Sequence, residues 1–275
     1  MPRTSVWLAC FRGMQVACHL LSGVLLACFF PLLEQNTRQR IVKYWSRKLL
    51  EIMNVGLDVH GSGHSAGMHG RMLVANHVSW LDVIALNAVA PACFAAKAEV
   101  RNWPLLGWLC QRVGTLFVRR DLKRDTLRIN REISGLLKQG TCVALFPEGT
   151  SSDGELPGHF HSALLQGAID VRAAIYPVAL RFHDGAGRSN GDAAFIGDMS
   201  FIASLWKILR SPSLHVSLLY LPPISSTDKS RRVLASETRG AIHIALAAHS
   251  TNYSVCVSSA ALAPRWKCAV AATQS

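Results

Sequence analysis

The segment MLVANHVSWLD, residues 72–82, decides the class of fold because it joins a strand to a helix. Its first four residues are all apolar, which is typical of a short buried strand. Asp82 can cap the helix that the next residues predict, over 82–89. The polar residues Asn76 and His77 therefore lie in a loop at the end of a strand, where active sites collect.

The same alternation of strand and helix continues along the chain. Apolar runs of strand length occur at 55–59, 72–75, 93–96, 115–118, 141–146, 175–180 and 215–221. Helical patterns lie between them, at 82–89, 104–113, 121–139 and 162–171. Short strands that alternate with helices predict an α/β fold, in which helices flank a central mixed sheet.

Composition limits the size and the partners of the protein. The chain has 275 residues, enough for one substantial α/β domain and too few for two large ones. Hydrophobic residues make up 50% and charged residues 17%, which excludes a disordered chain and a coiled coil. The net charge of +12 suits an anionic partner: nucleic acid, an acidic lipid headgroup or a phosphorylated substrate. The mean hydropathy of +0.22 favours a membrane contact.

The cysteines form neither a disulfide framework nor a zinc site. The chain has 8 of them, and no two follow the C-x-x-C spacing that is typical of structural zinc. Most have apolar neighbours, so we expect reduced and mostly buried thiols in a protein that faces the cytosol.

The N-terminal part has the composition of a membrane anchor. Gly13–Leu33 contains no Asp, Glu, Lys or Arg, and as a helix it spans about 30 Å, the thickness of a bilayer core. Gln15, His19 and Pro31 weaken it, so a shallow or re-entrant helix competes with a full span. Basic residues are more numerous after this segment than before it, which predicts that the body of the protein is cytoplasmic. A cleaved signal peptide is the alternative, although bulky residues occupy its cleavage position.

Residues 38–54 predict an amphipathic helix with apolar residues on one face and basic residues on the other. Such a helix can pack on the domain core or lie on an anionic membrane surface. We therefore divide the chain into three parts. Residues 1–54 hold the apolar segment and the basic helix, 55–248 form the main domain, and 249–275 form a flexible tail.

One motif is typical of a serine hydrolase. The residues Gly63-His64-Ser65-Ala66-Gly67 match G-x-S-x-G, the nucleophile elbow, which needs a strand before it and a helix directly after it. Here the following residues lead into another strand, which indicates a glycine-rich connection. A lipase that uses Ser65 is therefore the less favoured alternative.

A second motif, His77 followed five residues later by Asp82, is weak when taken by its spacing alone. A carboxylate bonded to one imidazole nitrogen fixes the tautomer and raises the basicity of the other nitrogen. That pair can act as a general base towards a hydroxyl group without an activated serine. The simpler alternative is that Asp82 caps a helix and His77 is a donor in the loop.

Taken together, four segments resemble the glycerolipid acyltransferases, the family that includes 1-acylglycerol-3-phosphate acyltransferase. The four blocks are Asn76–Asp82, Gly114–Arg119, Phe146–Thr150 and Ile175–Val178, and they occur in the family's order and at its separations. The resemblance covers roughly residues 55–223. It implies a fold like that of glycerol-3-phosphate acyltransferase, with an N-terminal membrane-binding helical segment before the acyltransferase domain.

The resemblance also implies a reaction, the transfer of an acyl group from a thioester to the hydroxyl of a lysolipid. His77 would take the hydroxyl proton, and Asp82 would stabilise the imidazolium that forms. The turn at 148–150 would position the acceptor, and its backbone could polarise the carbonyl group. The substrate-binding candidates are Arg119, Glu148, Gly149, Thr150 and, at another strand end, Lys97.

Arg119 matches the family's phosphate-binding arginine, and four cations could extend its positive field: Arg120, Lys123, Arg124 and Arg128. Many relatives carry a further arginine after Phe-Pro-Glu-Gly-Thr, where this chain has Ser151. The stretch Gly197–Phe201 with Trp206 also resembles a bacterial subgroup that includes lyso-ornithine lipid acyltransferases. We expect lysophosphatidic acid as the acceptor and phosphatidic acid as the product, with lyso-ornithine lipid or another lysolipid as the alternative.

The expected setting follows from the same resemblance. Acyl-CoA or an acyl carrier protein thioester would be a co-substrate, and no resident cofactor, metal or nucleic acid is expected. An anionic membrane surface is the further partner. We expect the protein at the bacterial inner membrane, with its catalytic domain facing the cytoplasm.

Overall fold

The computed structural model describes residues 3–61, 70–103, 105–119 and 123–258. Within them a 7-stranded sheet has the order β1-β7-β6-β2-β5-β3-β4. The strands are β1 (Val55–His60), β2 (Met72–Ala75), β3 (Cys93–Lys97), β4 (Leu116–Val118), β5 (Val143–Leu145), β6 (Ile175–His183) and β7 (Leu214–Tyr220). The pair β6–β7 is antiparallel and the other neighbours are parallel, so the prediction of a mixed α/β sheet is confirmed.

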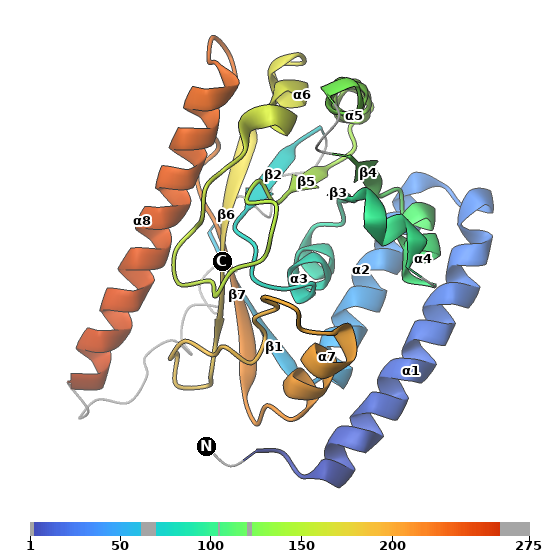
Figure 1. The fold of residues 1–275 in the computed structure, drawn as a ribbon, viewed down its shortest axis with the longest axis vertical. Helices are drawn as coiled ribbons and strands as arrows, with labels where there is room; N and C mark the ends of the chain where they lie inside the picture. Colours follow the sequence, from blue (N-terminus) through green and yellow to red (C-terminus); the bar gives the residue numbers. More distant parts are fainter. Residues whose placement is uncertain (1–2, 62–69, 104, 120–122, 259–275) are drawn as a thin grey trace, which may run out of the picture.

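Helices cover both faces of the sheet (Figure 1). The α-helices are α1 (Val6–Phe29), α2 (Gln35–Ile52), α3 (Leu81–Val89), α4 (Leu106–Arg112), α5 (Lys123–Lys138), α6 (Gln166–Ile169), α7 (Phe201–Leu209) and α8 (Arg231–Ser258). Short 3₁₀ helices are η1 (Phe30–Leu32), η2 (Ala98–Asn102) and η3 (Ser162–Leu165). One core cluster joins the sheet to α1, α2, α3 and α7, and the other joins it to α5, α6 and α8.

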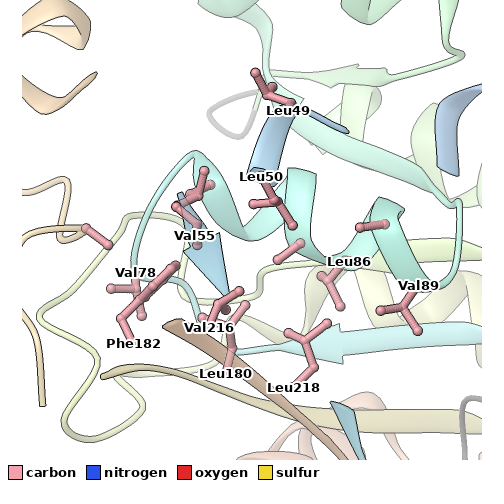
Figure 2. Packing of buried hydrophobic residues seen from close by; sticks show 14 of the residues in the cluster. Leu49, Leu50, Val55, Val78, Leu86, Val89, Leu180, Phe182, Val216 and Leu218 are labelled. Atoms are coloured by element: carbon pink, nitrogen blue, oxygen red, sulfur yellow. The ribbon is translucent and has the colours of Figure 1, made fainter. Parts of the chain in front are cut away.

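Strand β2 shows why the opening segment is apolar throughout. Leu73 and Ala75 belong to one core cluster, whereas Met72 and Val74 belong to the other, so this central strand is buried on both faces. Figure 2 shows the first cluster, in which Leu86 of α3 lies among side chains of the strands and of α2.

The N-terminal helix α1 lies on the surface of the domain, at the right of Figure 1. Ser5 caps it by accepting from the backbone N–H of Leu8. Over Val6–Leu32 it is long and apolar enough to cross a membrane, and most of its side chains are not buried in the protein. The polar residue His19 is paired with Trp45 of α2, through stacked rings and two hydrogen bonds to backbone oxygens.

Three details differ from the sequence expectations. Helices α7 and α8 were not predicted, and α8 continues to Ser258, past residue 249, from which we expected a tail. Residues 259–275 lie outside the described residues. Cys93 and Cys142 are buried as expected, but the cysteines of α1 are exposed, because the apolar face of this helix is itself exposed: Cys10, Cys18 and Cys28.

A carboxylate and two histidines cross three strands at the β1 end of the sheet. The Oδ2 atom of Asp58 lies 3.3 Å from Nε2 of His183 and 3.5 Å from Nδ1 of His215, and the two rings are stacked. The hydrogen bond from His183, with the charges of His215 and His60, lowers the pKa of Asp58 despite its partial burial. At His183, burial and the charge of Arg181 lower the pKa. The hydrogen bonds to Asp58 and to the Asp184 carbonyl outweigh them and raise the pKa above 6.5.

These shifts make the stability of the fold depend on pH. The raised His183 pKa contributes stability below its ordinary value of 6.5, and this is lost as the pH rises through the folded-state pKa. The lowered Asp58 pKa contributes stability above its ordinary 3.8, and this is lost at more acidic pH. We therefore expect Asp58→Asn to lower the melting temperature most between about pH 4 and 6.5, and less at about pH 8. Thermal unfolding at several pH values tests this, with the exposed Asp198→Asn as control; equal losses at all pH values would contradict it.

Candidate active site

His77 and Asp82 form the centre of the candidate site, in the loop between β2 and α3. The Nδ1 atom of His77 lies 2.8 Å from Oδ2 of Asp82, which is fully buried, whereas the imidazole is 22% exposed. The Nε2 atom has no partner among the described residues. An imidazole that donates Nδ1–H to a carboxylate has its lone pair on Nε2, where it can accept a proton.

Asp82 does more than hold the imidazole. Its Oδ2 atom also accepts from the backbone N–H groups of Val78 at 2.7 Å and Ser79 at 2.9 Å. The sequence expectation that Asp82 caps α3 is wrong in position, because the helix begins at Leu81 and Trp80 occupies the cap without a side-chain bond. Asp82 lies in the first turn, where the helix dipole favours a negative charge, and reaches back to the loop.

The chain that follows β5, where the third sequence block lies, contacts the loop that carries His77. The ring of Phe146, just after β5, stacks on the imidazole of His77 with a centroid distance of 4.3 Å and an angle of 17°. Ser152, which the sequence analysis did not single out, donates both its backbone N–H, at 2.8 Å, and its hydroxyl to the carbonyl of His77. These contacts fix the loop that carries the candidate base.

Glu148 faces this loop with both carboxylate oxygens. It is 7% exposed, and it accepts from the backbone N–H of His77 at 2.9 Å and of Gly158 at 3.1 Å. Burial raises the pKa of this carboxyl group, although the two N–H groups and the nearby His77 oppose the shift. The sequence analysis expected Glu148 to position the acceptor, but its oxygens are already engaged by the main chain.

The remaining part of the turn is open. Gly149 has a φ of +78°, which favours glycine, and the exposed Thr150 makes no hydrogen bond to the described residues. Ser151 donates its hydroxyl to the carbonyl of Phe195. Asn76 makes two hydrogen bonds of 2.8 Å to the backbone of Leu180, which ties the end of β2 to β6. Asn76 belongs to the first sequence block, but its hydrogen bonds to β6 were not predicted from the sequence.

The two cationic candidates lie at the same edge of the sheet. Lys97 ends β3, Arg119 follows β4, and the strands are parallel neighbours, with Lys97 paired to Val118. Both side chains are exposed, and neither makes an ion pair within the described residues. The carboxyl ends of β2, β3, β4 and β5 thus bring the sequence candidates to one edge, as parallel strands require.

The positive field around Arg119 is smaller than the sequence suggested. Arg128 contacts Asp125 at 2.9 Å and also Glu132, so its charge is balanced within α5. Arg124 is exposed and makes no ion pair within the described range 123–258. Two of the expected cations, Arg120 and the side chain of Lys123, lie outside the described part of the chain.

An apolar cavity of about 330 Å³ adjoins Phe146. It lies at the carboxyl ends of β3, β4 and β5, and its lining is Ala95, Val118, Thr126, Leu145, Phe146, Pro147, His161, Ala163, Leu164 and Leu165. The ring of Phe146 lines the cavity and also stacks on the imidazole of His77, so this ring connects the cavity to the candidate base.

Other chemistries have less support in the described residues. No group of three or more His, Cys, Asp or Glu residues there could hold a metal ion. Burial raises the pKa of the Cys93 and Cys142 thiols to about 12, so neither forms a thiolate nucleophile readily. Ser65, the alternative serine nucleophile, lies outside the described residues.

Known proteins that resemble this chain share one chemistry. A family model described as Acyltransferase matches residues 56–181. The lyso-ornithine lipid O-acyltransferase of Pseudomonas aeruginosa is 38% identical over 76% of this chain and 79% of its own length. The 1-acyl-sn-glycerol-3-phosphate acyltransferase of Neisseria meningitidis is 38% identical over 72% of this chain and 76% of its own length.

A solved structure supports the fold. The crystal structure of the 1-acyl-sn-glycerophosphate (LPA) acyltransferase from Thermotoga maritima matches with a TM-score of 0.62. The match covers 87% of this chain and 98% of that chain, at 19% sequence identity. At this identity, the likeness is evidence of a shared fold alone.

The first prediction concerns the charge of Asp82. In Asp82→Asn the amide oxygen can still accept the loop bonds, but the negative charge that stabilises the imidazolium is lost. We expect kcat to fall by about 10²–10⁴-fold, and His77→Ala to lose at least as much. Steady-state kinetics on purified variants measures this, with the remote Asp170→Asn as the matched control. Near-normal turnover by His77→Ala would exclude His77 as the base.

The second prediction separates two roles for Glu148. In Glu148→Gln one oxygen can still accept, but the amide N–H₂ group faces a backbone N–H, so one loop bond is lost. The loop of His77 then loses its alignment, and we expect kcat to fall about tenfold or more, while KM for the acceptor changes little. A rise in acceptor KM with kcat preserved would instead show that Glu148 binds the acceptor.

Proposed function

Because the chain belongs to the glycerolipid acyltransferase family, we propose that it acylates lysophosphatidic acid with a thioester-bound fatty acid and forms phosphatidic acid. The observation that carries the proposal is the His77–Asp82 pair, in which Nε2 of His77 has no partner among the described residues. The similarity to named acyltransferases over more than 70% of the chain supports the same chemistry.

The reaction needs one proton to move twice. Nε2 of His77 takes the proton of the acceptor hydroxyl as its oxygen attacks the carbonyl carbon of the thioester. The carbon–sulfur bond then breaks, and the imidazolium, stabilised by Asp82, returns the proton to the departing thiolate. No acyl-enzyme forms, so both substrates are bound together and their positioning lowers much of the barrier.

The cavity beside Phe146 suits the acyl group. Its walls are mostly apolar, and one of its lining residues, Phe146, also stacks on the imidazole of His77. Backbone N–H groups of the turn at 148–150 could polarise the carbonyl. The thiol carrier of the donor is either coenzyme A or acyl carrier protein.

Two acceptors have to be weighed, because relatives of equal identity carry both names. We favour the phosphate of lysophosphatidic acid, since the side chains of Arg119 and Arg124 are exposed and form no ion pair within the described residues. A carboxylate does lie near Arg119, because Asp125 accepts from its backbone N–H at 2.6 Å. Lyso-ornithine lipid is the second candidate. It is favoured by Ser151, whose hydroxyl bonds to the Phe195 carbonyl where many relatives have an arginine.

The protein is associated with the membrane, consistent with α1 and with its lipid-acylating relatives. We place it at the bacterial inner membrane, with residues 1–54 as the anchor and 55–248 as the acyltransferase domain facing the cytoplasm. The basic residues after the apolar segment support this orientation. Protection of the domain from protease added outside intact spheroplasts would support it, and cleavage there would contradict it.

The acceptor prediction uses a panel of lysolipids. Purified enzyme should turn over lysophosphatidic acid faster than lyso-ornithine lipid or uncharged monoacylglycerol. Arg119→Ala should lower kcat/KM for lysophosphatidic acid about tenfold or more, through loss of a charged hydrogen bond, and change monoacylglycerol much less. Arg131→Ala, an exposed arginine of α5, is the matched control. Faster turnover of lyso-ornithine lipid would overturn the acceptor and leave the acyl transfer intact.

A further inference from the structure

A second cavity, of about 470 Å³, lies where the α1–α2 junction meets α4. Its lining is Phe30, Pro31, Arg38, Trp108, Gln111 and Arg112. In Figure 1 the α1–α2 junction is at the upper right of the molecule. The lining combines two cations, one amide and aromatic rings, a set that fits an anion attached to an apolar group.

This cavity is separate from the candidate active site. Gln35, at the start of α2, donates to the hydroxyl of Thr141 at 2.8 Å, just before β5 begins. Strands β2 and β5 are parallel, so Thr141 marks the amino edge of these strands, whereas His77 follows the carboxyl end of β2. The cavity therefore lies near the amino ends of β2 and β5, whereas His77 and Asp82 lie at the opposite edge of the sheet.

Each of the two arginines is held by a contact within the protein, and neither has an anionic partner among the described residues. Arg38 donates from Nε to the carbonyl of Leu33 at 2.7 Å, which leaves its terminal nitrogens for another acceptor. The guanidinium of Arg112 lies over the ring of Trp108, 5.1 Å from its centroid. Stacking occupies the face of a guanidinium and leaves its N–H edge free. Within the described residues neither arginine forms an ion pair, and Glu34, one turn from Arg38, is exposed.

The helix beside the cavity strengthens its positive potential. Helix α2 has 18 residues and begins at Gln35, with no acidic residue in its first turn and no side-chain cap from Glu34. No side-chain hydrogen bond caps the positive end of its dipole, and the carboxylate at that end, Glu34, is exposed to solvent.

The rim of the cavity is apolar and exposed. Leu32 is 82% exposed, and Phe29 and Val113 are also exposed. Leu32 ends the segment Val6–Leu32, which is long and apolar enough to enter a membrane. A cationic cavity bordered by exposed apolar side chains suits the interface of a bilayer, where phosphate groups lie above acyl chains.

We propose that this cavity binds the phosphate-bearing headgroup of an anionic phospholipid in the membrane that holds α1. Arg38 and Arg112 donate to the phosphate oxygens, and Gln111 supplies a further donor. Phe30 and Trp108 pack against the glycerol and ester region. The apolar rim selects a membrane lipid over free phosphate, because it is hidden from water only when a bilayer covers it.

The test measures binding to vesicles of phosphatidylcholine, with and without phosphatidylglycerol. The double variant Arg38→Gln with Arg112→Gln should lose about fivefold or more of the extra affinity that phosphatidylglycerol provides. The control pair Arg40→Gln with Arg101→Gln removes the same charge from exposed positions in α2 and η2, and should lose about twofold or less. Equal losses in the two pairs, or no loss in either, would overturn the proposal.

Two further measurements keep the test decisive. Arg38 also holds the Leu33 carbonyl, so Arg112→Gln alone, compared with Arg101→Gln, replaces the double variant if the latter melts early. Inorganic phosphate at constant ionic strength should leave vesicle binding unchanged, and competition by it would show a free-phosphate site instead. The assay needs no turnover, so its result is independent of the proposed acyl transfer.

Discussion

The site depends on one buried oxygen atom. Oδ2 of Asp82 accepts from the imidazole of His77 and from two backbone N–H groups of the same loop. The three donors replace hydrogen bonds to water that this carboxylate loses on burial. The same bonds give the loop its shape, so the group that orients the base also builds the backbone that carries it.

The rest of the sheet holds this loop from three sides. Asn76 ties it to β6, Glu148 binds the N–H of His77, and Ser152 binds the carbonyl of the same residue. Because strands β2, β5 and β6 are parallel, the residues after them reach the same edge and can act on one loop. The Phe-Pro-Glu-Gly turn therefore has a structural role towards His77 in addition to whatever it does for substrates.

Much of this was predictable from sequence, and the reasons for the failures are specific. Apolar runs identified the strands, because β2 is buried on both faces and has no polar position to obscure it. The pairing of His77 with Asp82 was predictable because only the end of one short loop separates His77 from the first turn of α3, which holds Asp82. The direction of Glu148 and the neutralisation of Arg128 were not, since they depend on which N–H groups and carboxylates the fold brings near. Helix α8 was missed because its sequence has only a weak apolar period.

The proposed direct transfer of the acyl group accounts for the firm hold on the loop. Without an acyl-enzyme the base must be aligned before both substrates arrive, so its geometry cannot be left to substrate binding. That requirement has a cost in stability. The other carboxylate oxygen of Asp82 and the hydroxyl of Ser79 are buried without hydrogen-bond partners in the described part of the chain, and each such group costs about 1–3 kcal/mol. The unpaired polar atoms lie directly behind the proposed base, where an apolar replacement would pack better but would remove the carboxylate that bonds to His77.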